Sequence, residues 1–119
     1  KLGVVSLEPK FSEICTETML KTLDNYKINM ITHPTRSYPM DMERIAKKCE
    51  ETNTLLEIND PKGLLNADQV RKVLKVSDKV NFAVGSDAHC VENVGKCETA
   101  FKIIKESGVD IKRVVNVEE

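Results

Sequence analysis

The chain has 119 residues, which is enough for one domain with a buried core, and we expect residues 1–119 to form a single domain. Eighteen Lys and Arg residues oppose nineteen Asp and Glu residues, so the net charge is −1. This balance argues against a nucleic-acid partner held through phosphate contacts, and no apolar run is long enough to cross a membrane.

The cysteine spacing and the first residues of the chain bear on the cellular compartment in which we expect the protein. Four cysteines occur without a Cys-x-x-Cys pair, and the first residues lack the continuous apolar core of a signal peptide. We therefore expect reduced thiols and a cytoplasmic protein. Lys1 in place of a methionine predicts a piece of a longer protein or a processed product.

The first part of the chain predicts a strand, a loop and a helix. The apolar run 2–7 is expected to form a strand. Residues 10–15 then form a loop from which Phe11 and Ile14 pack inward. Apolar residues at helical spacing predict a helix over 16–23.

The second apolar run, 28–32, predicts a strand that leads directly into His33. His33 is either a strand-end residue held by backbone carbonyls or part of a site. Arg36 follows in a loop between two prolines and suits an anion, although an exposed arginine there is common. Asp41 then opens a helix over 42–51.

The third run, 54–60, places Glu57 between two apolar residues of a buried strand. A carboxylate at such a position is costly unless it is paired, hydrogen-bonded or bound to metal, so we expect it to be more than half buried. Asn59 points to the same side of the strand as Glu57. A capping-box variant beginning at Asn66 predicts a helix that ends near residue 77.

The fourth run, 80–84, reads as a buried strand that ends in Gly-Ser-Asp-Ala-His. Asp87 and His89 lie two residues apart in an extended segment, so their side chains leave the same face and can reach one metal ion. The alternative is that Asp87 caps the next helix and His89 is an exposed loop residue.

The last part of the chain predicts a helix over 94–107 with Gly108 as its stop. Its inward stripe is expected to hold Val94, Cys97, Phe101 and Ile104. The segment 111–117 follows as a turn with a strand stub.

Strands and helices alternate four times, which predicts an α/β fold with parallel strands joined by right-handed crossovers. Polar groups then fall at or near the carboxyl ends of successive strands, where the chemistry of α/β folds is located. These groups are Glu8, His33, Glu57 with Asn59, and Asp87 with His89.

Three motifs together carry a resemblance to a known family. They are Ile-Thr-His-Pro at 31–34, Leu-Glu-Ile-Asn at 56–59 and Gly-Ser-Asp-Ala-His at 85–89. With the helices between them they resemble the carboxyl-terminal half of a PHP (polymerase and histidinol phosphatase) domain, and most of all the stand-alone phosphatases of that family. The resemblance implies half of a distorted (β/α)7 barrel whose complete mouth binds zinc, manganese or iron and cleaves phosphoesters.

The resemblance also assigns roles. It implies that Asp87 and His89 are metal ligands and places His33, Glu57 and Asn59 near the barrel mouth. We expect His33 and Glu57 to act in catalysis. The expected substrate-binding residues, which would hold a small phosphorylated substrate, are Arg36, Asn59 and Ser86.

Two departures from the family pattern bear on activity. The amino-terminal part with its His-x-His pair is absent, and Leu7 stands where the family often has a ligand histidine. An isobutyl group cannot hold a metal. We therefore expect the isolated chain to be inactive, to need the amino-terminal half of the barrel as its partner, and to self-associate through exposed strand edges. A non-catalytic structural or regulatory module and a metal-dependent amidohydrolase remain the alternatives.

Overall fold

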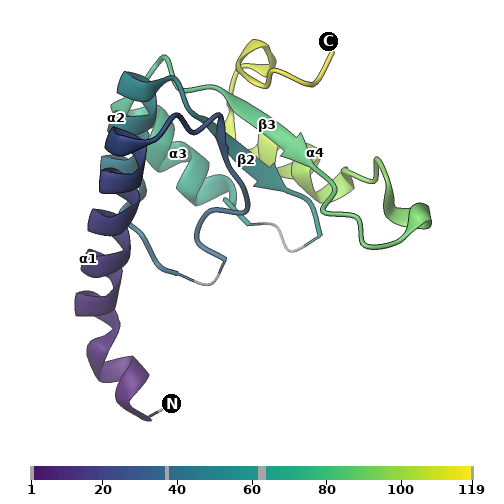
Figure 1. Cartoon of the computed structure of the whole chain (residues 1–119). Coiled ribbons are helices and arrows are strands. Elements are labelled where there is room, and N and C mark those ends of the chain that lie inside the picture. The colour runs from purple at the N-terminus through teal and green to yellow at the C-terminus, as the bar shows by residue number, and fades with distance from the viewer. Residues whose placement is uncertain (1, 37, 62–63, 119) are drawn as a thin grey trace.

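The computed structural model describes residues 2–36, 38–61 and 64–118, which form four α-helices and a three-stranded sheet (Figure 1). The elements follow in the order α1 (Leu2–Asn25), β1 (Met30–Ile31), α2 (Met42–Thr52), β2 (Leu55–Asn59), α3 (Ala67–Val76), β3 (Phe82–Gly85) and α4 (Glu98–Ser107). Two short 3-10 helices, η1 (Val91–Asn93) and η2 (Ile111–Arg113), lie on either side of α4 in the chain. The predicted α/β class is confirmed.

The sheet has the strand order β1-β2-β3, and both pairings are parallel. Met30 pairs with Leu55, and Glu57 pairs with Ala83. The expected parallel strands, adjacent in chain order, are therefore present. β1 is shorter than the run 28–32 suggested, because only two of its residues join the ladder.

The two faces of the sheet differ in character. Leu56, Ile58 and Phe82 are fully buried in a core shared with apolar side chains of α2, α3 and α4. Because side chains alternate along a strand, Glu57 and Asn59 lie on the opposite face. That face carries the polar residues on which the site depends.

Local capping signals set the limits of α2 and α3. The Asp41 carboxylate accepts the backbone N–H groups of Glu43 and Arg44 at 3.1 and 3.3 Å. The Asn66 and Gln69 side chains complete a reciprocal capping box at the start of α3. The predicted starts of both helices are confirmed.

The expectation of a strand over 2–7 and a loop over 10–15 is wrong, because α1 runs continuously through both segments. A strand needs a neighbouring strand for its backbone hydrogen bonds, whereas a helix satisfies them within its own segment. Phe11 and Ile14 are 37% and 55% exposed, so they do not pack into the core. The side chain of Leu7 lies outside the described part of the structure, and the lost ligand stays a prediction, as does any role for Glu8.

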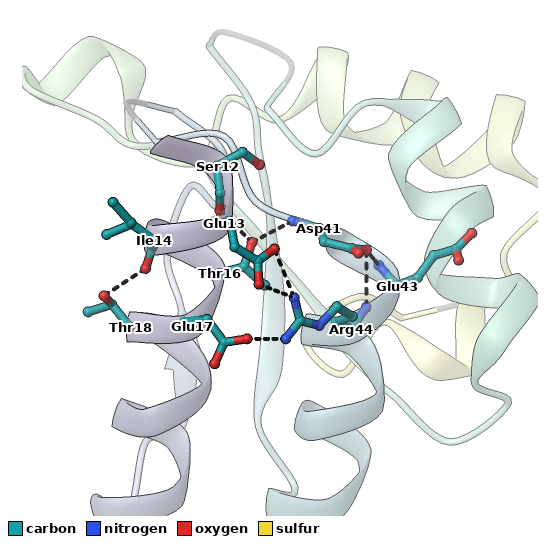
Figure 2. A network of polar contacts seen from close by, with 9 residues as sticks. All are labelled: Ser12, Glu13, Ile14, Thr16, Glu17, Thr18, Asp41, Glu43 and Arg44. Carbon is teal, nitrogen blue, oxygen red and sulfur yellow. Dashed lines mark hydrogen bonds and ion pairs between the residues drawn. The ribbon is translucent and has the colours of Figure 1, made fainter. Parts of the chain in front are cut away.

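Charged side chains dock α1 onto α2 (Figure 2). Arg44 donates from Nη1 to the Glu13 carboxylate at 3.1 Å and from Nη2 to Glu17. The buried Thr16 hydroxyl accepts the Asp41 N–H at 2.9 Å. These contacts involve only the carboxyl-terminal two thirds of α1, and its first turns extend past the rest of the molecule (Figure 1).

The helix expected over 94–107 begins later, at Glu98. Val94 and Phe101 are 71% and 47% exposed, so the predicted inward stripe is wrong at both positions. In the first turn of this helix the Ala100 N–H donates to Asp60, the residue directly after β2, at 2.8 Å. A cap from a residue 40 positions away cannot be recognised from local sequence. Gly108, at a φ of 76°, ends α4 as predicted.

The end of the chain covers the outer edge of β3. Val114 forms a parallel bridge to Phe82, and the Asn116 side-chain amide both accepts the Val84 N–H and donates to the Val84 carbonyl, each at 2.8 Å. The Asn116 side chain thus makes the two hydrogen bonds that the backbone of a neighbouring strand would make, at the place where a strand stub was expected. Among the described helices, none combines the length and the apolarity needed to cross a bilayer.

Candidate functional site at the carboxyl ends of the strands

The predicted site residues follow the three strands at one edge of the sheet. His33 comes two residues after β1, Asn59 is the last residue of β2, and Ser86 and Asp87 directly follow β3. Because the strands are parallel, their carboxyl ends meet at the same edge. The fold therefore gathers these residues as the strand pattern predicts.

Arg36 and Asp87 connect the loop after β1 with the loop after β3. Arg36 Nη1 lies 4.0 Å from Asp87 Oδ2, and the two side chains are 36% and 24% exposed. At this distance and exposure the pair contributes little to stability. Its significance is positional, since it places a guanidinium beside a carboxylate at the open edge of the sheet.

His89 has a defined tautomer. Its Nδ1 lies 2.7 Å from the Asp87 carbonyl oxygen. A carbonyl oxygen can only accept, so Nδ1 carries the proton in the neutral ring and Nε2 keeps a free lone pair. Such a hydrogen bond from the second ring nitrogen is typical of metal-binding histidines.

Glu57 is buried, as predicted, and is 7% exposed. Asn59 Nδ2 donates to Glu57 Oε1 at 2.7 Å, which confirms that the two side chains share a face. A Cβ atom on Gly85 would lie 2.9 Å from the Glu57 carboxyl carbon, so glycine leaves the room that this carboxylate occupies. Within the described residues, Asn59 Oδ1 is buried without a hydrogen-bond partner.

Backbone strain concentrates around the same edge. His33, Thr35 and Asp87 have φ values of 29°, 71° and 48°, in the left-handed region that residues other than glycine rarely adopt. For the β-branched Thr35 this conformation is a clear outlier. Strained residues persist where the surroundings hold them, and they cluster at functional sites.

His33 and Arg36 also line a cavity of about 390 Å³ between α1 and the segment 31–40. Sequence reasoning missed this cavity because its α1 wall was assigned to a loop and a shorter helix. Sequence reasoning also missed the contact of Asp60 with the start of α4 and the contact of Asn116 with the edge of β3. An asparagine within the apolar run 114–117 is the one local signal that pointed to Asn116.

The structure brings the Arg36 guanidinium to the Asp87 carboxylate and joins Glu57, Asn59 and Gly85 along β2 and β3. His89 contacts the backbone carbonyl of Asp87, and Asp87 has a φ of 48°, so the expectation of an extended segment over 87–89 is wrong. Ser86 is half-buried between Gly85 and Asp87. Over residues 2–36, 38–61 and 64–118, no group of three or more His, Cys, Asp or Glu side chains is close enough to hold a metal.

Known proteins similar to this chain bear one common name. A "Probable phosphatase" of Clostridium botulinum (strain Langeland) is 30% identical over 121 residues, covering 97% of this chain and 50% of its own length. Proteins of the same name from Shewanella frigidimarina and Syntrophotalea carbinolica are 28% and 30% identical and cover 91% and 85% of this chain.

The chain is similar to probable phosphatases. It spans about half the length of these curated relatives, covering 50%, 46% and 45% of the three proteins. No protein-family model matches it.

Proposed function

We propose that this chain is the carboxyl-terminal half of a PHP-type, metal-dependent phosphoesterase, in which it supplies three parallel strands and one side of the active site. The observation that carries the proposal is the meeting of Arg36, Asp87 and His89 at the carboxyl ends of the strands. The similarity to probable phosphatases over 97% of the chain supports phosphoester chemistry. The remaining strands of the barrel would come from a segment corresponding to the other half of the relatives.

Asp87 and His89 would hold one divalent metal. The donor set fits this role, because the Asp87 carbonyl leaves His89 Nε2 free and carboxylate with imidazole suits zinc, manganese or iron. When bound, the metal supplies Lewis-acid stabilisation of phosphoryl oxygens. Two ligands are fewer than a catalytic site requires, so further ligands would come from the amino-terminal half.

Arg36 would bind the phosphoryl group of the substrate. Its guanidinium is 36% exposed, so it can turn from Asp87 to a bound anion. A guanidinium offers paired N–H donors that match two phosphoryl oxygens. Ser86 adjoins the metal ligands and would contribute a further hydroxyl donor.

His33 would serve as the general acid that protonates the leaving oxygen, since it lies on the cavity wall close to Arg36 in the chain. Glu57 is enclosed by Asn59 and Gly85. We therefore assign it to positioning: it holds the Asn59 amide, whose buried Oδ1 could accept a hydrogen bond from an internal water.

The test is to assay the full-length protein on phosphomonoesters and cyclic amides with added manganese or zinc. We expect phosphomonoester hydrolysis that falls by about 10²-fold or more in Asp87→Asn and His89→Ala. Asp78→Asn is the matched control, because Asp78 is an exposed carboxylate in the turn before β3. Hydrolysis of amides alone would replace the proposal with an amidohydrolase, and no hydrolysis would favour a non-catalytic module.

The isolated 119-residue chain should behave differently from the full-length protein. Calorimetric titration with zinc or manganese should give weak binding, and phosphomonoester turnover should be slight. Tight stoichiometric binding with robust turnover, both lost in His89→Ala, would mean that these residues hold a complete site.

A further inference from the structure

The cavity between α1 and the segment 31–40 has a mostly apolar lining and one charged side chain in its wall, that of Arg36. Its volume of about 390 Å³ lies in the range of small-molecule sites. Arg36 is also the residue that approaches Asp87 at 4.0 Å. The cavity therefore adjoins the candidate site at the point where an anion would bind.

The apolar character of the helical wall has a structural cause. Thr18 and Thr22 line the cavity, and their hydroxyls donate to the backbone carbonyls of Ile14 and Thr18 at 2.7 and 2.9 Å. This leaves the methyl groups as the free parts of both side chains. Ile14 and Met19 complete the wall with hydrocarbon and a thioether.

The opposite wall combines the flexible side chain of Met40 with the packed ring of Tyr38. Met40 is a partly buried side chain packed against the core, and methionine fits irregular apolar shapes. Tyr38 packs against Phe11 with ring centroids 6.0 Å apart. Arg36 N–H donates to the His33 carbonyl at 3.2 Å, which closes a tight turn and fixes the backbone from which the Arg36 side chain extends.

We propose that this cavity binds the organic part of the substrate and that the substrate class is phosphomonoesters of apolar alcohols or phenols. The phosphoryl group lies at Arg36 and the hydrocarbon part lies against Ile14, Thr18 and Met19. The inference rests on the proposed phosphoesterase function. It deepens that function, because an open polar groove would suit sugar or glycerol phosphates instead.

Binding of phosphonates, which cannot be hydrolysed, tests the proposal on the full-length protein. By calorimetry we expect phenylphosphonate to bind about tenfold more tightly than methylphosphonate, since the ring adds apolar surface to be buried. Arg36→Ala should weaken both ligands to a similar degree. Equal affinity for the two phosphonates, or no detectable phenylphosphonate binding, overturns the proposal.

A filled cavity provides the matched comparison. Thr18→Trp should remove the preference for the phenyl group, whereas Lys21→Trp, on an exposed position of the same helix outside the lining, should retain it. If Thr18→Trp does not fold by circular dichroism, Met19→Ala serves: it enlarges the cavity and should favour 1-naphthylphosphonate over phenylphosphonate. The assignment is contradicted if a folded Thr18→Trp variant still prefers phenylphosphonate to methylphosphonate. It is also contradicted if Met19→Ala does not shift the preference toward 1-naphthylphosphonate.

The two proposals fail separately. A phenyl preference in binding without phosphomonoester turnover by the full-length protein would overturn the phosphoesterase and leave the cavity assignment standing. Turnover without any phenyl preference in binding would overturn the cavity assignment and leave the phosphoesterase proposal standing.

Discussion

Glu57 and Gly85 depend on each other at the residue scale. A buried carboxylate is tolerated where a hydrogen-bond donor meets it and where no side chain occupies its space. Asn59 provides the donor, and Gly85 leaves the space. The Leu-Glu-Ile-Asn and Gly-Ser-Asp motifs therefore form one packed unit across β2 and β3.

Gly85→Ala should lower the free energy of unfolding by about 1–3 kcal/mol, because the added methyl group overpacks against the Glu57 carboxylate. Urea unfolding followed by circular dichroism measures the effect. In a Glu57→Ala background the same substitution should cost clearly less, since the carboxylate that it meets is gone. Equal costs in both backgrounds would show that the contact is unimportant.

The four cysteines should differ in reactivity. Burial raises the pKa of the Cys49 thiol to about 12, so at pH 8 only about one molecule in ten thousand carries the thiolate. Cys90 is exposed. With iodoacetamide we expect Cys90 to be modified first and Cys49 only after unfolding in urea, as read by peptide mass spectrometry. Fast labelling of Cys49 in the native protein would contradict its burial.

The docking of α1 onto α2 is decided at the element scale by the Arg44 contacts (Figure 2). Hydrogen bonds from Arg44, and its charge, lower the pKa of the Glu17 carboxyl. The folded pKa is thus below the unfolded one, so the stabilisation is complete above the ordinary glutamate value near 4.5 and is lost as the pH falls through the lowered pKa.

Glu17→Gln should therefore lower the urea midpoint at pH 7 and have no effect in strong acid, where Glu17 is protonated in both states. The pair is exposed, so the difference should also shrink in 0.5 M salt. Measuring the midpoint of both proteins from pH 7 to pH 2 checks this. A difference that persists undiminished at pH 2 would mean that the carboxylate charge is not responsible.

Asn116 stabilises the outer edge of β3 at the same scale. Asn116→Ala should cost about 1 kcal/mol of unfolding free energy, because water can replace both lost hydrogen bonds at this exposed position. Hydrogen exchange of the Val84 amide should become faster. Val115→Ala is the control, since that side chain is 52% exposed and its backbone N–H donor to Phe82 is kept. An unchanged Val84 amide would refute this function of Asn116.

At the scale of the whole molecule, the sheet is closed at one side and open at the other. β3 is covered by residues 114–116, whereas β1 is the other edge strand in the order β1-β2-β3. Leu55 N–H donates to the Asn29 carbonyl, and Met30 pairs with Leu55, so the backbone groups of Met30 point away from β2. This edge is where a further strand could add.

We expect the isolated chain to form dimers through β1 that are detectable by sedimentation velocity. Met30→Pro should weaken them, because it removes an outward N–H without breaking the ladder to β2. Met30→Ala, which loses the same side chain but keeps the N–H, is the matched control. Equal dissociation by both variants would locate the interface elsewhere.

Local patterns in the amino-acid sequence are enough to predict the parallel α/β pattern, the starts of α2 and α3, the end of α4 and the burial of Glu57. Each of these depends on periodicity, a cap or a glycine within a few residues, and such signals are local. The placement of His33, Asn59 and Asp87 at one edge followed from the same alternation. Parallel strands bring their carboxyl ends together whatever the loops do.

Local patterns do not predict the course of α1, the late start of α4, the Asn116 contact or the pairing of Arg36 with Asp87. For α4 the deciding partner, Asp60, is distant in the chain, and the distant Arg44 holds the part of α1 that carries Glu13 and Glu17. A helix and a strand compete on nearly equal terms in a short apolar run, and a run without a neighbouring strand becomes a helix because a helix satisfies its own backbone hydrogen bonds. The cavity depends on the same cause, because one of its walls is α1.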